Sequence, residues 1–204
     1  MPFDTYAGLQ TAITAWAMRT GDTQFEAQTP NFIALCEKRI NRTLRVGAME
    51  KTATLTPDGT GAITLPADYL EFRSVQPSTA GYEAMQLVAP DFEVGMYEGG
   101  GVPRRFSIAG STLQTYPAAN GVVRVIYFAK IPALSVANPT NWLLDAAPDL
   151  YLYGSLLEAA PYMEEDARAQ VWKTYYDTAM ADLKANDVSA RYATGRARVR
   201  GPTP

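Results

Sequence analysis

Apolar residues near the N-terminus recur every three to four positions, which is the spacing of an amphipathic helix. The first such helix is expected over Thr5–Arg19, with Asp4 or Thr5 as its capping residue. Its apolar stripe consists of Tyr6, Leu9, Ile13 and Trp16. A second helix is expected to begin at Thr29-Pro30, a capping residue followed by proline at the first helical position, and to end near Gly47.

The pattern changes between Met49 and Asn141, where short runs rich in β-branched and aromatic residues alternate with Gly, Pro and Asn. These runs predict seven strands: Lys51–Thr56, Ala62–Leu65, Leu70–Gln76, Ala84–Val88, Arg104–Ala109, Thr112–Tyr116 and Val122–Lys130. Asn120-Gly121 predicts a tight hairpin between the last two strands, because both residues accept positive φ. One short helix is expected over Ala89–Tyr97.

Helical spacing returns after Pro148. Pro161 cannot donate a backbone N–H, so the helix that begins at Pro148 is expected to end or kink there. A last helix is expected over Glu164–Asn186, because the acidic residues Glu164, Glu165 and Asp166 suit the first turn of a helix. The two apolar stripes are Leu150, Tyr153, Leu157 and Ala160, then Trp172, Tyr176, Ala179 and Leu183.

This order predicts an α+β fold in which two N-terminal and two C-terminal helices form a four-helix bundle, since neither pair can bury its apolar stripe alone. We expect the bundle to comprise residues 1–47 and 148–187. An antiparallel β domain, similar to a sandwich or barrel, is expected to be inserted over residues 48–147, and an extended C-terminal arm over residues 188–204.

Composition removes several classes of enzyme from consideration. The chain has no histidine, and therefore no Ser-His-Asp or Cys-His nucleophile pair and no imidazole base. Cys36 is the single cysteine, which excludes an internal disulfide and a thiolate zinc site, and it is expected in the core. Neither a signal peptide nor a membrane span is visible, so we expect synthesis in a cytoplasm and no membrane partner.

The formal net charge of −3 is unevenly distributed along the chain. Residues 188–204 hold four arginines and no acidic residue, which leaves 14 basic and 21 acidic residues, or −7, on residues 1–187. An acidic surface repels phosphates, so DNA is expected to pass this body without adhering. The basic tail is either a solvated terminus or an arm that becomes ordered on a partner, with Tyr192 and Val199 as apolar anchors.

No motif predicts a catalytic, cofactor-binding or metal-binding site, and we expect none. An enzyme that uses Asp145, Glu158 or Glu164 is one alternative, although no spacing brings a defined pair of carboxylates together. A ligand- or carbohydrate-binding β module on a helical stalk is another. Twelve tyrosines, seven phenylalanines and three tryptophans favour self-association. Among them, five are expected as core and interface material: Tyr151, Tyr153, Trp172, Tyr175 and Tyr176.

Four segments carry a resemblance through their order and spacing: Leu65–Val75, Tyr127–Ser135, Asn138–Leu144 and, above all, Pro148–Tyr162. In these segments the chain resembles the head-to-tail adaptor proteins of tailed bacteriophages. This group includes the tail tubular or gatekeeper adaptors of podoviruses. None of the four segments is a catalytic signature. The resemblance covers most of the chain, from the β region through the last helix.

The resemblance implies a structural virion protein that is not an enzyme and needs no cofactor. It implies a ring of twelve copies beneath the portal protein, assembled in the host cytoplasm, with a channel through which DNA passes without sequence-specific binding. It also implies that the far face of the ring meets a downstream tail or nozzle protein. The C-terminal arm would bind portal subunits through Arg191, Tyr192, Arg196, Arg198, Val199 and Arg200.

Overall fold

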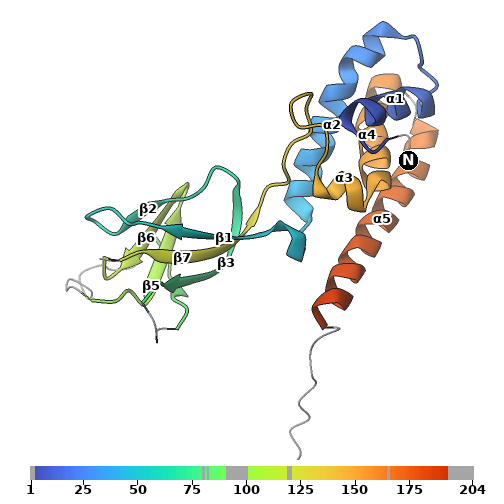
Figure 1. Cartoon of the computed structure of the whole chain (residues 1–204). Helices are drawn as coiled ribbons and strands as arrows, with labels where there is room; N and C mark the ends of the chain where they lie inside the picture. Colours follow the sequence, from blue (N-terminus) through green and yellow to red (C-terminus); the bar gives the residue numbers. More distant parts are fainter. Residues whose placement is uncertain are drawn as a thin grey trace, which may run out of the picture. The chain divides into compact units, whose positions relative to one another are not determined.

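The chain divides into a helical unit and a β unit. The computed structural model describes residues 3–79, 81, 83–90, 101–118, 121–164 and 166–192. Met1–Gly47 and Ile131–Pro204 make up the first unit, and Ala48–Lys130 make up the second. The helices lie in the first unit and the strands in the second, which confirms the α+β class (Figure 1). Residues 131–147, expected in the β domain, belong to the helical unit.

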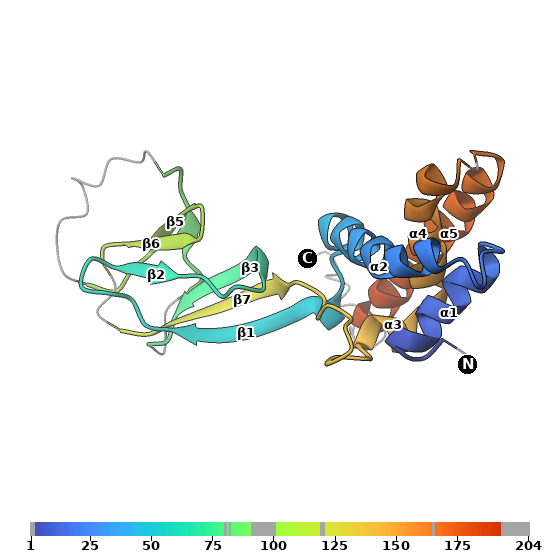
Figure 2. The same ribbon diagram turned by 90° about the horizontal axis from the view of Figure 1, so that it is seen from above.

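The described residues of the helical unit contain five helices, one more than the four expected for the bundle. They are α1 (Tyr6–Trp16), α2 (Thr23–Thr43), α3 (Trp142–Ala146), α4 (Pro148–Met163) and α5 (Asp166–Tyr192). Within the helical unit α4 lies between α2 and α5, and α1 packs against α2 and α4 (Figures 1 and 2). The added helix α3 has only five residues, too few to show a helical period in the sequence.

Helix α2 begins at Thr23, seven residues before Pro30, the first helical residue that the sequence predicts. Asp22 caps it by accepting hydrogen bonds from the backbone N–H groups of Gln24 and Phe25. Pro30 therefore lies inside the helix, where it cannot donate to the carbonyl of Glu26 four residues earlier. The Thr29 hydroxyl donates to that carbonyl instead, at 2.8 Å, so the helix continues without an unpaired acceptor.

The C-terminal helices also differ from the predicted boundaries. Helix α4 continues past Pro161 to Met163 and ends at Glu164, which adopts a left-handed conformation with φ 57°. Glu164 is therefore a C-terminal cap of α4, and its expected place in the first turn of the next helix is wrong. Helix α5 extends to Tyr192, so residues 188–192, expected in the extended arm, are helical.

The β unit contains two sheets. The three-stranded sheet has the order β1 (Glu50–Leu55), β7 (Val123–Ala129), β3 (Tyr69–Pro77). The four-stranded sheet has the order β2 (Ala62–Thr64), β6 (Thr112–Tyr116), β5 (Arg105–Ala109), β4 (Gln86–Leu87). Every pairing is antiparallel except that of β4 with β5. Each predicted strand therefore has an observed counterpart. The 3-10 turn η1 (Gly47–Met49) precedes β1.

The hairpin predicted at Asn120-Gly121 is wrong, because the strands before and after it, β6 and β7, lie in different sheets. The tight hairpin instead joins β5 to β6, where Ala109 pairs with Thr112. Gly110 has φ +60° in this two-residue turn, a conformation that glycine adopts without strain. The chain between β6 and β7 is thus a crossing from one sheet to the other.

Side chains from both sheets share one hydrophobic core. Its fully buried members include Phe106 and Leu113 from the four-stranded sheet and Val123 and Val125 from β7. Phe72 of β3 meets Phe106 edge to face, with 5.1 Å between the ring centroids. The alternating burial of β7 follows from this arrangement, because one face of the strand is turned into the core.

Two side chains of α2 fasten the segment after β7 to the helical unit. Asn41 Oδ1 accepts a hydrogen bond from the backbone N–H of Ile131 at 2.9 Å. Glu37 Oε1 accepts one from the backbone N–H of Leu134 at 2.8 Å. These bonds explain why residues 131–147 belong with the helices and not with the strands that precede them.

The short helix expected over Ala89–Tyr97 lies almost wholly outside the described residues. Among the helices that the structure describes, none combines the length and apolar character needed to cross a membrane.

Candidate functional site

The predicted portal-binding residues divide between helix α5 and the chain that follows it. Arg191 and Tyr192 form the end of α5. Asp187 Oδ2 accepts a hydrogen bond from Arg191 Nε at 2.7 Å, and its Oδ1 accepts one from the backbone N–H of Gly47, also at 2.7 Å. This link holds the last turns of α5 against Gly47, which follows α2 in the chain. The remaining predicted residues, Arg196, Arg198, Val199 and Arg200, lie outside the described residues.

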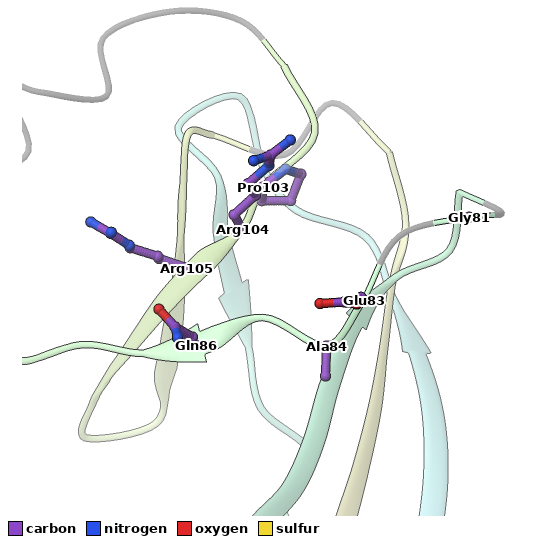
Figure 3. Close-up of a pocket in the computed structure, with 7 residues that line it drawn as sticks. All are labelled: Gly81, Glu83, Ala84, Gln86, Pro103, Arg104 and Arg105. Carbon is purple, nitrogen blue, oxygen red and sulfur yellow. The ribbon is translucent and has the colours of Figure 1, made fainter. Parts of the chain in front are cut away.

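A hollow of about 540 Å³ lies on the β unit. Glu83 enters it from the segment before β4, and Arg104 and Arg105 belong to the chain at the start of β5 (Figure 3). The described lining residues include no serine, cysteine or aromatic side chain. They therefore supply neither a nucleophile with its base nor a ring for a sugar to stack on, and the hollow does not favour the carbohydrate-binding alternative.

The three carboxylates of the enzyme alternative have separate structural roles. Glu158 Oε1 accepts a hydrogen bond from Arg39 Nε at 2.5 Å, in an ion pair between α4 and α2. Glu164 caps α4, and Asp145 lies in α3. Nowhere in the described parts of the chain do three or more Cys, Asp or Glu side chains gather closely enough to hold a metal ion. The contacts described for Glu158 and Glu164 are structural and do not favour the hydrolase alternative.

A buried polar network in the helical unit contains two groups whose pKa values are raised. The Tyr151 hydroxyl donates to Glu37 Oε1 at 3.2 Å and accepts from Asn141 Nδ2 at 2.8 Å. Burial raises the pKa of the Glu37 carboxyl and, with the nearby Glu37 charge, that of the Tyr151 hydroxyl. Tyr151 is fully buried and Asn141 and Glu37 are nearly so, and no substrate reaches them. We interpret the network as structural.

Cys36 is buried completely, which confirms that it is a core residue. Desolvation raises the pKa of its thiol, so the reactive thiolate form is suppressed. Gly154 of α4 lies directly against this thiol, since a Cβ built on Gly154 would stand 2.4 Å from Cys36 Sγ. The site is a close helix contact and not a catalytic centre.

The helical unit exposes a line of three aromatic rings, one from each of three helices, which we name the aromatic row: Trp16 of α1, Tyr153 of α4 and Tyr175 of α5. Trp16 meets Tyr153 edge to face, with centroids 5.8 Å apart, and Tyr153 stacks on Tyr175 at 5.0 Å. Trp16 is 48 % exposed and Tyr175 is 52 % exposed. Rings that are both ordered and solvent-exposed are typical of protein contact surfaces.

The sequence predicts five aromatic residues as core and interface material, and the structure separates them into two groups. Tyr151, Trp172 and Tyr176 are buried, whereas Tyr153 and Tyr175 belong to the aromatic row. Trp16 was assigned to the apolar stripe of its helix, and the row was missed as a surface. No local signal could have shown it, because its members lie on three helices far apart in the sequence.

The chain matches a known protein family. The family model described as SU10 adaptor protein matches residues 4–200, a range that includes both units and the arginine-rich tail. None of the curated proteins matches the chain.

Proposed function

The chain belongs to the SU10 adaptor protein family, and from this membership we propose that it joins the head of a tailed bacteriophage to its tail. The family is one of structural phage proteins, so the chain is a virion component with a structural role. In the proposed arrangement, copies of the chain form a ring of twelve beneath the portal protein. The ring extends the DNA channel and presents its far face to a downstream tail or nozzle protein.

The observation that carries the proposal is the family match over residues 4–200, because it covers both structural units. The excess of acidic residues over residues 1–187 supports a conduit that does not retain DNA. The separate structural roles of Glu158, Glu164 and Tyr151 agree with a protein that acts through shape and contacts.

We place portal binding on the end of the chain. Helix α5 delivers Arg191 and Tyr192 at its last turn, and Arg196, Arg198, Val199 and Arg200 follow. One exposed arginine–carboxylate pair contributes about 0–1 kcal/mol, so a single arm binds weakly. Twelve arms on one ring raise the effective concentration of each, which makes the assembled contact strong.

Electron microscopy of the purified chain, with and without the portal protein of the same phage, tests this function. We expect rings docked on the portal, and a chain that remains solitary beside the portal would refute the proposal. Assembly is expected in the host cytoplasm, which recovery of docked rings from infected cells before tail attachment would support.

The role of the arm is tested separately with a chain that ends at Tyr192, because this truncation keeps the whole of α5. We expect it to lose portal docking. Changing Arg196, Arg198 and Arg200 together to Gln is expected to weaken docking, whereas the matched change to Lys keeps the charge and should retain part of it. Unchanged docking by the truncated chain would exclude the arm as the portal-binding element.

A further inference from the structure

We infer that the aromatic row of one copy docks on the outer face of helix α2 of a second copy of the same chain. We define the α2 outer face by four residues on one stripe of that helix: Asn31, Leu35, Lys38 and Arg42. The inference rests on the proposed function, since it names the surfaces that would join neighbouring copies in the ring.

The ring contacts within the aromatic row already restrict its side chains in the single chain. Tyr153 is held between Trp16 and Tyr175 by ring contacts on both sides, so little side-chain freedom remains to be lost on docking. Tyrosine and tryptophan are also the residues that most often dominate the energy of protein contacts. A partner that covers the half-exposed rings of Trp16 and Tyr175 would remove a large apolar area from water.

The α2 outer face has the complementary character. Leu35 is 45 % exposed at its centre, with Lys38 and Arg42 one and two turns further along the helix. Among the described residues, no carboxylate pairs with Lys38 or Arg42. Arg39, on the neighbouring stripe, is instead committed to Glu158 within the same chain. The outer face thus offers one apolar side chain and two available cations.

A carboxylate beside the aromatic row can pair with those cations. Asp149 lies one helical turn before Tyr153 on α4 and is exposed. Burial, then the neighbouring Tyr175 and the Asp149 charge, raise the pKa of the Tyr153 hydroxyl. Within the described part of the chain, no lysine or arginine pairs with Asp149. Lysine and arginine also bind favourably over tyrosine and tryptophan rings. Charge and ring chemistry therefore both match the row to the α2 outer face.

The aromatic row does not lie on the side of α4 that contacts α2. Gly154 and Glu158 face α2, through Cys36 and Arg39 respectively. Successive residues turn by about 100°, which puts Tyr153 about 100° from Gly154 and about 140° from Glu158 around the helix. A contact between two different surfaces of identical chains leaves both surfaces free at the ends. It therefore repeats from copy to copy and closes into a ring when the rotation permits.

Disulfide trapping with the full chain tests the inference. The double variant Lys38→Cys/Asp149→Cys should form a ladder of covalent multimers under oxidation, with and without portal protein. A mixture of the two single variants should give cross-linked dimers only, because each pair then forms one bond. Adding Tyr175→Ser to the double variant should lower the yield of the ladder about tenfold while the helical signal is unchanged.

The matched control is Lys38→Cys/Lys184→Cys, since Lys184 is exposed on α5 but lies half a turn around that helix from Tyr175. It should give no ladder, and the natural chain, whose Cys36 is buried, should give none. Rings on the portal without a Lys38–Asp149 ladder would overturn the inference and leave the proposed function standing. A result with neither rings nor a ladder would overturn both the inference and the proposed function. Dimers formed by Asp149→Cys alone would overturn the head-to-tail contact.

Discussion

Replacing Gly154 with alanine is expected to destabilise the helical unit, although alanine is the better helix former. The added Cβ would stand 2.4 Å from Cys36 Sγ and 3.0 Å from Tyr176 Cε2. Ordinary contacts between such atoms begin near about 3.5 Å, so the overlap with the sulfur is about 1 Å. Cys36 is fully buried and its side chain is short, which leaves the sulfur little room to move.

Two effects oppose each other in this variant. Alanine in place of glycine inside a helix contributes about 1 kcal/mol of stability. Overpacking of a close-packed core costs about 1–3 kcal/mol, and here the clash involves α2 and α5 together. Because two helices must give way, we take the upper part of that cost, about 2–3 kcal/mol, and expect the free energy of unfolding to fall by about 1–2 kcal/mol for Gly154→Ala.

Urea unfolding, followed by circular dichroism of the helices, measures the change as a lower midpoint at constant slope. The double variant Cys36→Ala/Gly154→Ala removes the clashing sulfur, and we expect it to lose at least about 1 kcal/mol less than the sum of the single variants. Gly59→Ala is the control, because no heavy atom lies within 4 Å of its added Cβ. A Gly154→Ala chain as stable as the natural chain would refute the close-packing argument.

Three further predictions concern stability and reactivity. Burial places the pKa of Glu37 above its ordinary value of 4.5 in the folded chain. The free energy of unfolding should therefore fall as pH rises from about 4.5 through that raised pKa. Urea midpoints measured against pH should show this fall for the natural chain and not for Glu37→Gln. Asp187→Ala leaves the Gly47 N–H without its acceptor and should lower the free energy of unfolding by about 1–2 kcal/mol. Amide exchange at Val188–Tyr192 should become faster. Exchange like that of the natural chain would contradict the role of the link between Asp187 and Gly47. Burial raises the pKa of the Cys36 thiol, so a disulfide reagent should modify it only at the rate of unfolding, and rapid reaction in the native state would disprove its core position.

Local patterns in the sequence identified most elements because helices and strands each impose their own period on the residues they bury. The stripe of Leu9 and Ile13 marked α1, and the alternation around Val123 and Val125 marked β7. The first residue of α2 could not be inferred from the local pattern alone. Pro30 indicated a start, yet the Thr29 hydroxyl satisfies the carbonyl that proline leaves unpaired, so the helix begins at Thr23.

Pairing between distant segments could not be inferred in the same way. Asn120-Gly121 has the composition of a hairpin, but β6 and β7 pair in different sheets, and alternation alone does not specify a strand's neighbour. The place of residues 131–147 likewise depends on Asn41 and Glu37 of α2, about a hundred residues earlier in the chain. Such choices rest on hydrogen bonds that form only when the chain has folded.

The sequence by itself determined the α+β class, the core position of Cys36 and the resemblance to phage adaptors, because each depends on residue type and order. The tertiary structure decided which helices meet at Gly154, which sheet each strand joins and which aromatic rings remain exposed. The physical reason is that burial is a property of three-dimensional neighbours. Trp16, Tyr153 and Tyr175 form a surface only because α1, α4 and α5 pack side by side.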